Sequence, residues 1–132
     1  MNTLPPIQFK SIPNKEQRYP TVGDYFADGD TIQFRVSDMD KRYQLLVLIH
    51  ELFEWFSISE KGIPIDKIDD FDIKFEQLRK AFPWIIGDQE PGHMISAPYH
   101  MDHVDAEEIE KLVAKKLKVD WDEYNNYLDT LE

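Results

Sequence analysis

The chain has 132 residues, of which 42% are hydrophobic and 13% aromatic, and it contains no cysteine. This is enough apolar material for one domain with a core, which excludes a wholly disordered chain. Its 26 acidic residues outnumber 15 basic ones, for a net charge of −11. That excess disfavours direct binding to duplex DNA or to an anionic membrane, since both reward clustered lysine and arginine. The lack of cysteine excludes disulfides, thiolate-bound zinc and a cysteine nucleophile.

The N-terminal part is predicted to be an extended arm, residues 1–20, followed by a β-hairpin, residues 21–37. The sequence Asp28-Gly29 is a strong signal for the hairpin turn. Residues 7–12 alternate between apolar and polar side chains, as a half-buried strand does. They are therefore a candidate third strand.

The first 20 residues contain four prolines and no apolar segment of the kind found in secretory signals. The longest apolar run, residues 45–49, is much shorter than the roughly 18 residues that suggest a membrane span. We therefore expect a cytoplasmic protein that does not associate with a membrane.

The rest of the chain, residues 38–132, is predicted to form a helical bundle. Ser37 or Asp38 offers an N-cap for the first helix, and the segment Pro83–Tyr99 reads as a long loop. Four helices are expected, over residues 39–59, 65–82, 100–117 and 121–128. The predicted fold class is α+β and mainly helical, with three to four helices, a small N-terminal antiparallel hairpin or sheet, and a single domain over residues 1–132.

The first predicted helix is apolar over most of its circumference, which is typical of a central, buried helix. Its polar side chains fall within one sector when residues advance by about 100°. His50 and Glu54 are four residues apart and therefore lie one above the other, a spacing that can chelate a metal ion. The alternative is that His50 is a hydrogen-bonded core histidine, with Glu51 and Glu54 emerging into solvent.

The motif His50-Glu51-Leu52-Phe53-Glu54 resembles the H-E-x-x-H motif of zincins with its second histidine replaced by glutamate. A carboxylate in that place favours harder metals, so magnesium, manganese and iron join zinc as candidate cofactors. In a metal site built around this motif we assign Glu51 either the role of general base or that of a bridging ligand.

Two further ligands are expected from the other helices. Asp72 lies at the edge of the apolar stripe of the second helix, and His103 lies in the first turn of the third. Both have ordinary alternatives, since aspartate is common near helix N-termini and histidine is common on surfaces. His93 is expected to be exposed to solvent. The predicted metal ligands are thus His50, Glu54, Asp72 and His103.

Two resemblances extend this interpretation. Glu51 and Glu54, followed by Asp69 and Asp72, resemble the E-E-x-x-E…E-x-x-D pattern of all-α nucleotide pyrophosphohydrolases of the MazG type. His50 and Asp69 stand where that pattern has glutamates. This resemblance implies magnesium dependence, a homo-oligomer such as a dimer, and a nucleoside triphosphate substrate. The layout of hairpin, Arg35–Asp38 segment and helical motif also looks like that of small uncharacterised phage and prophage proteins.

The function that follows is a divalent-metal-dependent hydrolase of a phosphoester or nucleotide pyrophosphate, with a small phosphorylated substrate. No glycine-rich phosphate loop and no G-x-S-x-G nucleophile elbow is present in the sequence. The alternative is a non-enzymatic acidic protein that binds a basic protein partner or mimics a nucleic acid. A hydrolase requires acidic groups that converge beside His50, whereas a mimic requires them spread over an exposed face.

Overall fold

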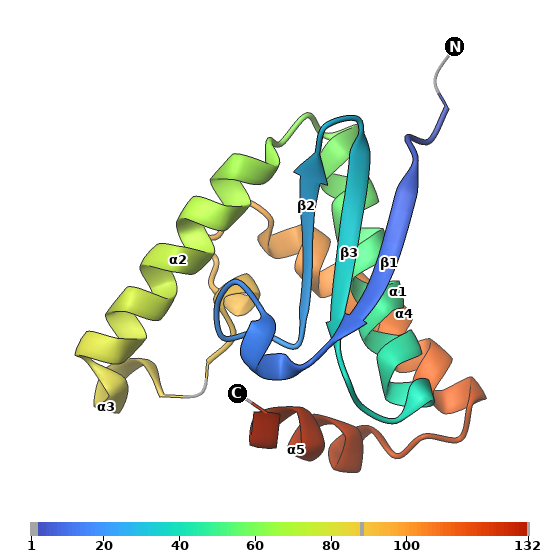
Figure 1. Ribbon diagram of the computed structural model, residues 1–132. Helices are drawn as coiled ribbons and strands as arrows, with labels where there is room; N and C mark the ends of the chain where they lie inside the picture. Colours follow the sequence, from blue (N-terminus) through green and yellow to red (C-terminus); the bar gives the residue numbers. More distant parts are fainter. Residues whose placement is uncertain (1–2, 88, 132) are drawn as a thin grey trace.

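The computed structural model describes residues 3–87 and 89–131 and consists of a small N-terminal sheet followed by helices (Figure 1). Strands and helices occur in the order β1 (Ile7–Ile12), β2 (Gly23–Asp28), β3 (Thr31–Ser37), α1 (Lys41–Glu60), α2 (Ile65–Ala81), α3 (Pro83–Ile86), α4 (His100–Lys116) and α5 (Trp121–Leu131). Two short 3₁₀ turns, η1 (Asn14–Glu16) and η2 (Pro91–His93), complete this order. The predicted α+β, mainly helical fold class is confirmed.

The sheet has the strand order β1-β3-β2 and is mixed. The predicted hairpin is present: β2 and β3 pair antiparallel, with Gly29 at a positive φ of 62° in the turn. The segment 7–12 is indeed a strand, but it runs parallel to β3, so the expectation of a purely antiparallel sheet was wrong. Alternation of side chains identifies a strand but carries no information about the direction of its neighbour.

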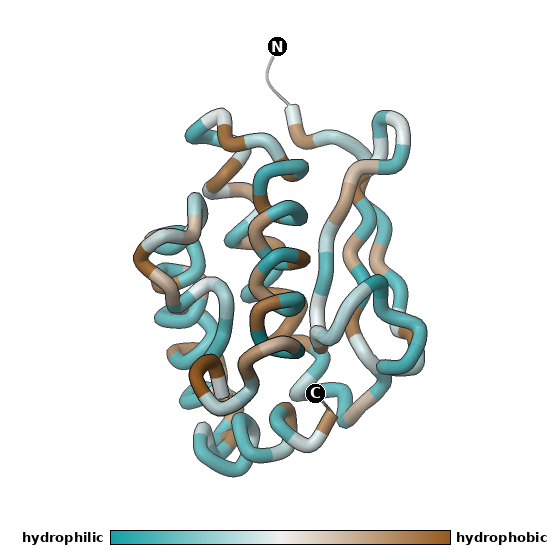
Figure 2. Tube along the Cα trace, turned by 90° about the vertical axis from the view of Figure 1, so that its left-hand side faces the viewer, coloured by the Kyte–Doolittle hydropathy of each residue, from teal (hydrophilic) through white to brown (hydrophobic). Residues whose placement is uncertain are grey.

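Helix α1 is the centre of the molecule. It packs against β2 and β3 on one side and against α4 on another, and a side view shows the strands on one side and helices α1, α2 and α4 on the other (Figure 2). The helix begins later than predicted, because Asp40, not Ser37 or Asp38, is its N-cap and accepts a hydrogen bond from the backbone nitrogen of Arg42 at 2.9 Å. It ends just before Gly62, which has a positive φ of 70°.

Two hydrophobic clusters lie at different levels along α1. The first contains Trp55 and Ile58 from the C-terminal half of the helix, packed against Tyr25, Phe34, Ile68, Ala97 and Tyr99. The second contains Leu46 and Val47 from its N-terminal half, packed against Val36, Ala114 and Tyr124. His50 and Glu54 fall between these two levels and are themselves buried. The polar groups of α1 are therefore enclosed on both sides by apolar core.

The predicted loop 83–99 contains the short helices α3 and η2. Each is too short to show the apolar periodicity by which a helix is recognised in a sequence. Residue 88 of this loop lies outside the described residues, as do residues 1, 2 and 132 at the ends of the predicted domain. Over the described ranges, none of the helices combines the length and the apolar character that a bilayer crossing requires.

Candidate metal centre

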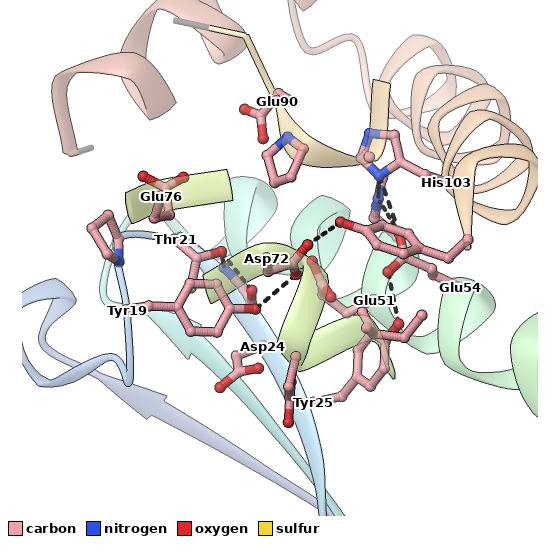
Figure 3. Close-up of a pocket in the computed structure, with 18 of the residues that line it drawn as sticks. Tyr19, Thr21, Asp24, Tyr25, Glu51, Glu54, Asp72, Glu76, Glu90 and His103 are labelled. Atoms are coloured by element: carbon pink, nitrogen blue, oxygen red, sulfur yellow. Dashed lines mark hydrogen bonds and ion pairs between the residues drawn. The ribbon is translucent and has the colours of Figure 1, made fainter. Parts of the chain in front are cut away.

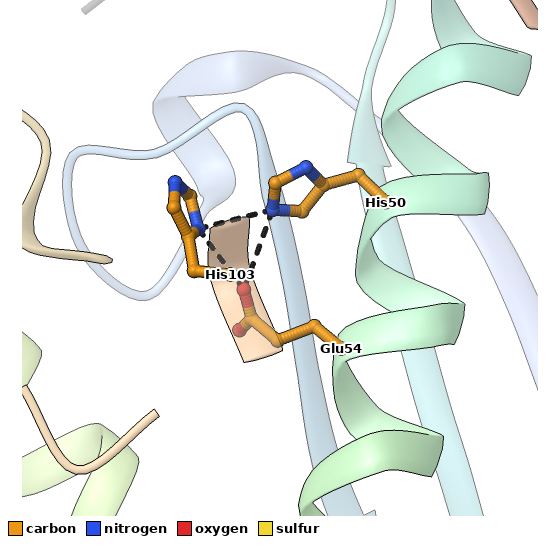
Figure 4. Close-up of side chains that lie close together, drawn as sticks. All are labelled: His50, Glu54 and His103. Carbon is orange, nitrogen blue, oxygen red and sulfur yellow. Dashed lines mark hydrogen bonds and ion pairs between the residues drawn. The ribbon is translucent and has the colours of Figure 1, made fainter. Parts of the chain in front are cut away.

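Three potential ligand atoms converge between α1 and α4 (Figure 4). Nε2 of His50 lies 3.3 Å from Oε2 of Glu54, one turn further along α1. Nδ1 of His103, in the first turn of α4, lies 3.1 Å from Nε2 of His50 and 3.1 Å from the same oxygen of Glu54. The structure thus brings together three of the four predicted ligands.

The spacing of these atoms suits a metal ion. For a tetrahedral ion with bonds of about 2.0–2.1 Å, neighbouring ligand atoms lie about 3.3–3.4 Å apart. For an octahedral ion with bonds of about 2.1–2.2 Å, the corresponding separation is about 3.0–3.1 Å. The observed separations of 3.1–3.3 Å match one face of either polyhedron. Two imidazoles and one carboxylate would therefore hold an ion on one side and leave its other positions open.

Glu110 fixes the orientation of the His50 ring from behind. Its Oε1 lies 2.7 Å from Nδ1 of His50, and its Oε2 accepts a hydrogen bond of 2.5 Å from the hydroxyl of Tyr124. With Nδ1 held by Glu110, the ring presents Nε2 to Glu54 and His103. Carboxylate–histidine pairs of this kind orient metal-bound histidines and raise their basicity.

The charges of the ion-free cluster are set by the same contacts. Burial opposes ionisation of both His50 and Glu54, but their hydrogen bonds outweigh it. Bonds to Glu110 and Glu54 raise the pKa of His50 well above its usual range. Bonds from His103 and His50 lower the pKa of Glu54 to about 2. A buried carboxylate that stays ionised is what a cation site requires.

Two contacts place α4 so that His103 reaches α1. The buried carboxylate of Asp102 accepts a hydrogen bond of 2.5 Å from the hydroxyl of Ser57 and lies 2.7 Å from Nζ of Lys61. Both partners belong to the C-terminal end of α1 or follow it directly. Because Asp102 precedes His103 in the chain, this link fixes the first turn of α4 against α1.

The turn η2 covers the outer side of His103. A Cβ atom built on Gly92 would lie only 2.4 Å from Cγ of the His103 ring. No side chain fits there without displacing the imidazole, so the close approach of backbone to ring depends on glycine. His100 supports the same turn, because its Nδ1 lies 3.0 Å from the carbonyl oxygen of Gly92.

Glu51 stands beside the triad and lines the two cavities that meet there. Among the described residues, none donates a hydrogen bond to its carboxylate. Burial and the charge of Glu54 raise its pKa well above the usual range, and His50 opposes this shift. A partly buried carboxyl group that accepts no hydrogen bond from the described residues and stands next to a potential metal site suits the predicted role of general base.

Asp72 faces the first of these cavities but is not part of the triad. Its carboxylate accepts hydrogen bonds from the hydroxyls of Tyr99 and, at 3.2 Å, Tyr19. Burial raises the pKa of Asp72 to about 7, even though both hydrogen bonds lower it. The structure therefore does not bring Asp72 together with His50, Glu54 and His103, and it engages the carboxylate with tyrosines instead.

The first cavity, which we call the acidic cavity, has a volume of about 60 Å³ and lies between α1, α2, β2 and η2 (Figure 3). Some of its acidic groups are neutralised by arginines: Arg18 contacts Asp24 at 2.7 Å and Asp69 at 3.1 Å, and Arg79 contacts Glu76 at 3.1 Å. The acidic residues that line this cavity are Asp24, Glu51, Glu54, Asp69, Asp72, Glu76 and Glu90.

Several residues of the site carry no signal in the sequence. Tyr25, whose hydroxyl donates to Oε1 of Glu54 at 2.7 Å, reads as an ordinary hydrophobic strand residue. Tyr124 reads as part of an aromatic tail that packs on the bundle, which it does. Glu110 was recognisable only as a member of the helix face shared with His103. The one general indication in the sequence is that a buried tyrosine hydroxyl usually has a hydrogen-bond partner, which makes tyrosines candidates for contact with buried carboxylates.

Comparison with known proteins adds no relative: no family model matches the chain, and no curated protein and no solved structure matches it.

Proposed function

We propose that this protein is a divalent-metal-dependent hydrolase whose ion is held by His50, Glu54 and His103. The observation that carries the proposal is the convergence of three ligand atoms at 3.1–3.3 Å beside an unbonded carboxylate and an acidic cavity. Two histidines and a carboxylate leave coordination positions for water or substrate, as catalytic sites do.

The chemistry of such a site follows from the ion and from Glu51. An ion held by His50, Glu54 and His103 would supply an activated water as the nucleophile. We assign Glu51 the role of general base, which accepts a proton from the attacking water and passes it to the leaving group. Its freedom from hydrogen bonds within the described structure supports this role, since a carboxylate already saturated by donors would be a weak base.

The ligand set narrows the choice of metal. Imidazole nitrogens suit zinc, iron and other transition metals, whereas magnesium prefers oxygen ligands and retains its waters. Two of the three proposed ligands are histidines. We therefore favour zinc, iron or manganese over the magnesium implied by the resemblance to MazG-type enzymes.

For the substrate we propose a phosphoester or nucleotide pyrophosphate. The acidic cavity is lined by both acidic pairs of the MazG-type pattern, Glu51 with Glu54 and Asp69 with Asp72. Their presence in one cavity supports the resemblance to MazG-type enzymes. Arg79 also lines this cavity, where its guanidinium is paired with Glu76 and donates to the backbone carbonyls of Gly87 and Gln89. The negative lining requires that the substrate enter together with a cation.

The acidic residues beside His50 also bear on the alternative, an acidic binding protein. They converge on a cavity and pair with histidines, tyrosines and arginines inside the molecule. A mimic of nucleic acid would need these charges free on an exposed face. The arrangement therefore supports the hydrolase.

The deciding experiment is elemental analysis of the purified chain, without a tag and without chelators, before and after incubation with zinc, manganese or iron and desalting. We expect one tightly bound equivalent in the native protein and none in Glu54→Gln. The matched control is Glu60→Gln, which removes a charge from an exposed position of the same helix. Equal metal content in all three proteins, each helical by circular dichroism, would contradict the proposal.

A further inference from the structure

A second group of potential ligands lies on the outer side of His103. His93 in η2, Glu107 in α4 and His103 each offer one ligand atom, and these atoms lie within 4.8 Å of one another. Nε2 of His93 is 2.6 Å from Oε2 of Glu107, and the rings of His93 and His103 are 4.8 Å apart in an edge-to-face arrangement. This group contains no residue of α1.

The second ring nitrogen of His103, Nε2, is available to this outer group. Nδ1 faces His50 and Glu54, while no described residue forms a hydrogen bond with Nε2. Figure 4 shows this second nitrogen turned away from the other two ligands. An imidazole can bind an ion through either nitrogen. When both ligand groups are occupied, His103 bridges the two ions as an imidazolate, and its remaining ring N–H proton is released to solvent.

The outer group also faces open space. A second cavity of about 100 Å³ is lined by His93, His103 and Glu107 together with His50 and Glu51. The side chains of His93 and Glu107 are 46% and 36% exposed, against 13% for His103. An ion could therefore enter from solvent, and the exposed ligands could move apart from their 2.6 Å contact to the wider spacing that coordination needs.

We propose that His93, Glu107 and His103 form a second, solvent-facing cation site, distinct from the buried centre. Its two imidazoles and one carboxylate favour zinc, nickel or cobalt over magnesium and calcium. It binds more weakly than the buried centre, because His93 and Glu107 are exposed to solvent whereas His50 is held by Glu110. The inference does not depend on hydrolase activity.

The experiment is a calorimetric titration of the metal-free protein with Zn²⁺, in high salt to screen nonspecific binding to the acidic surface. We expect two binding events, one tight and one weaker, each close to one equivalent. The double variant His93→Asn/Glu107→Gln should lose the weaker event and keep the tight one. The matched control, Glu108→Gln, removes the next carboxylate, which is exposed on the same helix, and should keep both.

The results separate this inference from the proposed function. Loss of the tight event in Glu54→Gln with the weaker event retained supports two distinct sites. A weaker event without any tight one would leave the outer site standing and remove the buried centre. A tight event alone in the native protein, or a weaker event that survives the double variant or disappears in Glu108→Gln, would overturn the outer site. His93 and Glu107 would then act only as an ion pair that holds η2 on α4.

Discussion

Glu110 and His50 form a buried pair in which Oε1 of the carboxylate lies 2.7 Å from Nδ1 of the ring. The two residues are 60 positions apart and come from α4 and α1. The pair fixes the orientation of the ring, so that Nε2 of His50 is the nitrogen that faces Glu54 and His103. It also explains why a histidine with 8% of its surface exposed is tolerated within the core.

The first prediction concerns this pair. Glu110→Gln should weaken metal binding at the buried centre about 10- to 100-fold, the usual effect of removing a carboxylate behind a metal-bound histidine. Tyr124→Phe should act in the same direction but less, because it removes only the 2.5 Å hydrogen bond that orients Glu110. Competition with a chromophoric chelator measures both affinities. Tyr127→Phe, an exposed tyrosine of the same helix, is the control; equal affinities in all variants would contradict the assignment.

The second prediction separates the roles of two glycines. Gly92→Ala should push the His103 ring aside, since the new Cβ would lie 2.4 Å from it, and should reduce metal affinity. Gly23→Ala should leave metal affinity intact but disturb Glu51 and Val47, whose side chains would lie 2.9 and 2.6 Å from the new Cβ. The readout is metal content beside hydrolytic activity. Loss of metal in Gly23→Ala, or full retention in Gly92→Ala, would refute the distinction.

The third prediction concerns catalysis. Glu51→Gln keeps the shape of the side chain and should retain metal, while hydrolysis falls about 10²- to 10⁴-fold, as expected for loss of a general base. The measurement is turnover of a panel of phosphoesters and nucleotides by the metal-loaded proteins. Activity near the native level in the metal-loaded variant would exclude Glu51 as the base.

The fourth prediction concerns the pH dependence of stability. Burial raises the pKa of Asp72 from 3.8 to about 7, so the folded state binds a proton that the unfolded state releases. Asp72 therefore contributes most to stability below pH 4, and this contribution is lost as the pH rises towards 7. At about 1.4 kcal/mol per pKa unit, the loss is at most about 4 kcal/mol.

Asp72→Asn removes this dependence because an amide does not ionise. The variant should be more stable than the native protein at pH 8 and should approach it at pH 4. Urea unfolding at both pH values measures the difference. A variant that is less stable at pH 8 would contradict this prediction. It would show that the hydrogen bonds from Tyr19 and Tyr99 stabilise the ionised carboxylate by more than burial destabilises it.

The sequence was informative where local pattern determines structure. The apolar surface of residues 45–58 and the polar sector of His50 and Glu54 predicted a central helix with a buried polar strip, and the Asp28-Gly29 turn predicted the hairpin. The direction of β1 depends on pairing across the chain, which no local pattern encodes. Asp72 was expected among the metal ligands from its place on a helical wheel. A helical wheel shows on which face of a helix a residue lies, but not how far that residue is from the neighbouring helix. Here Tyr19 and Tyr99 donate hydrogen bonds to Asp72, which is not part of the triad.

The position of the ligands also has a consequence for the chain as a polymer. Glu54 and His103 are 49 residues apart, with α2, α3 and η2 between them. An ion that joins them would act as a reversible cross-link in a chain that has no cysteine. By the loop-entropy relation used for disulfides, closing a loop of this size restricts the unfolded chain by about 4 kcal/mol. Removal of the ion by a chelator would then lower the free energy of unfolding by a comparable amount.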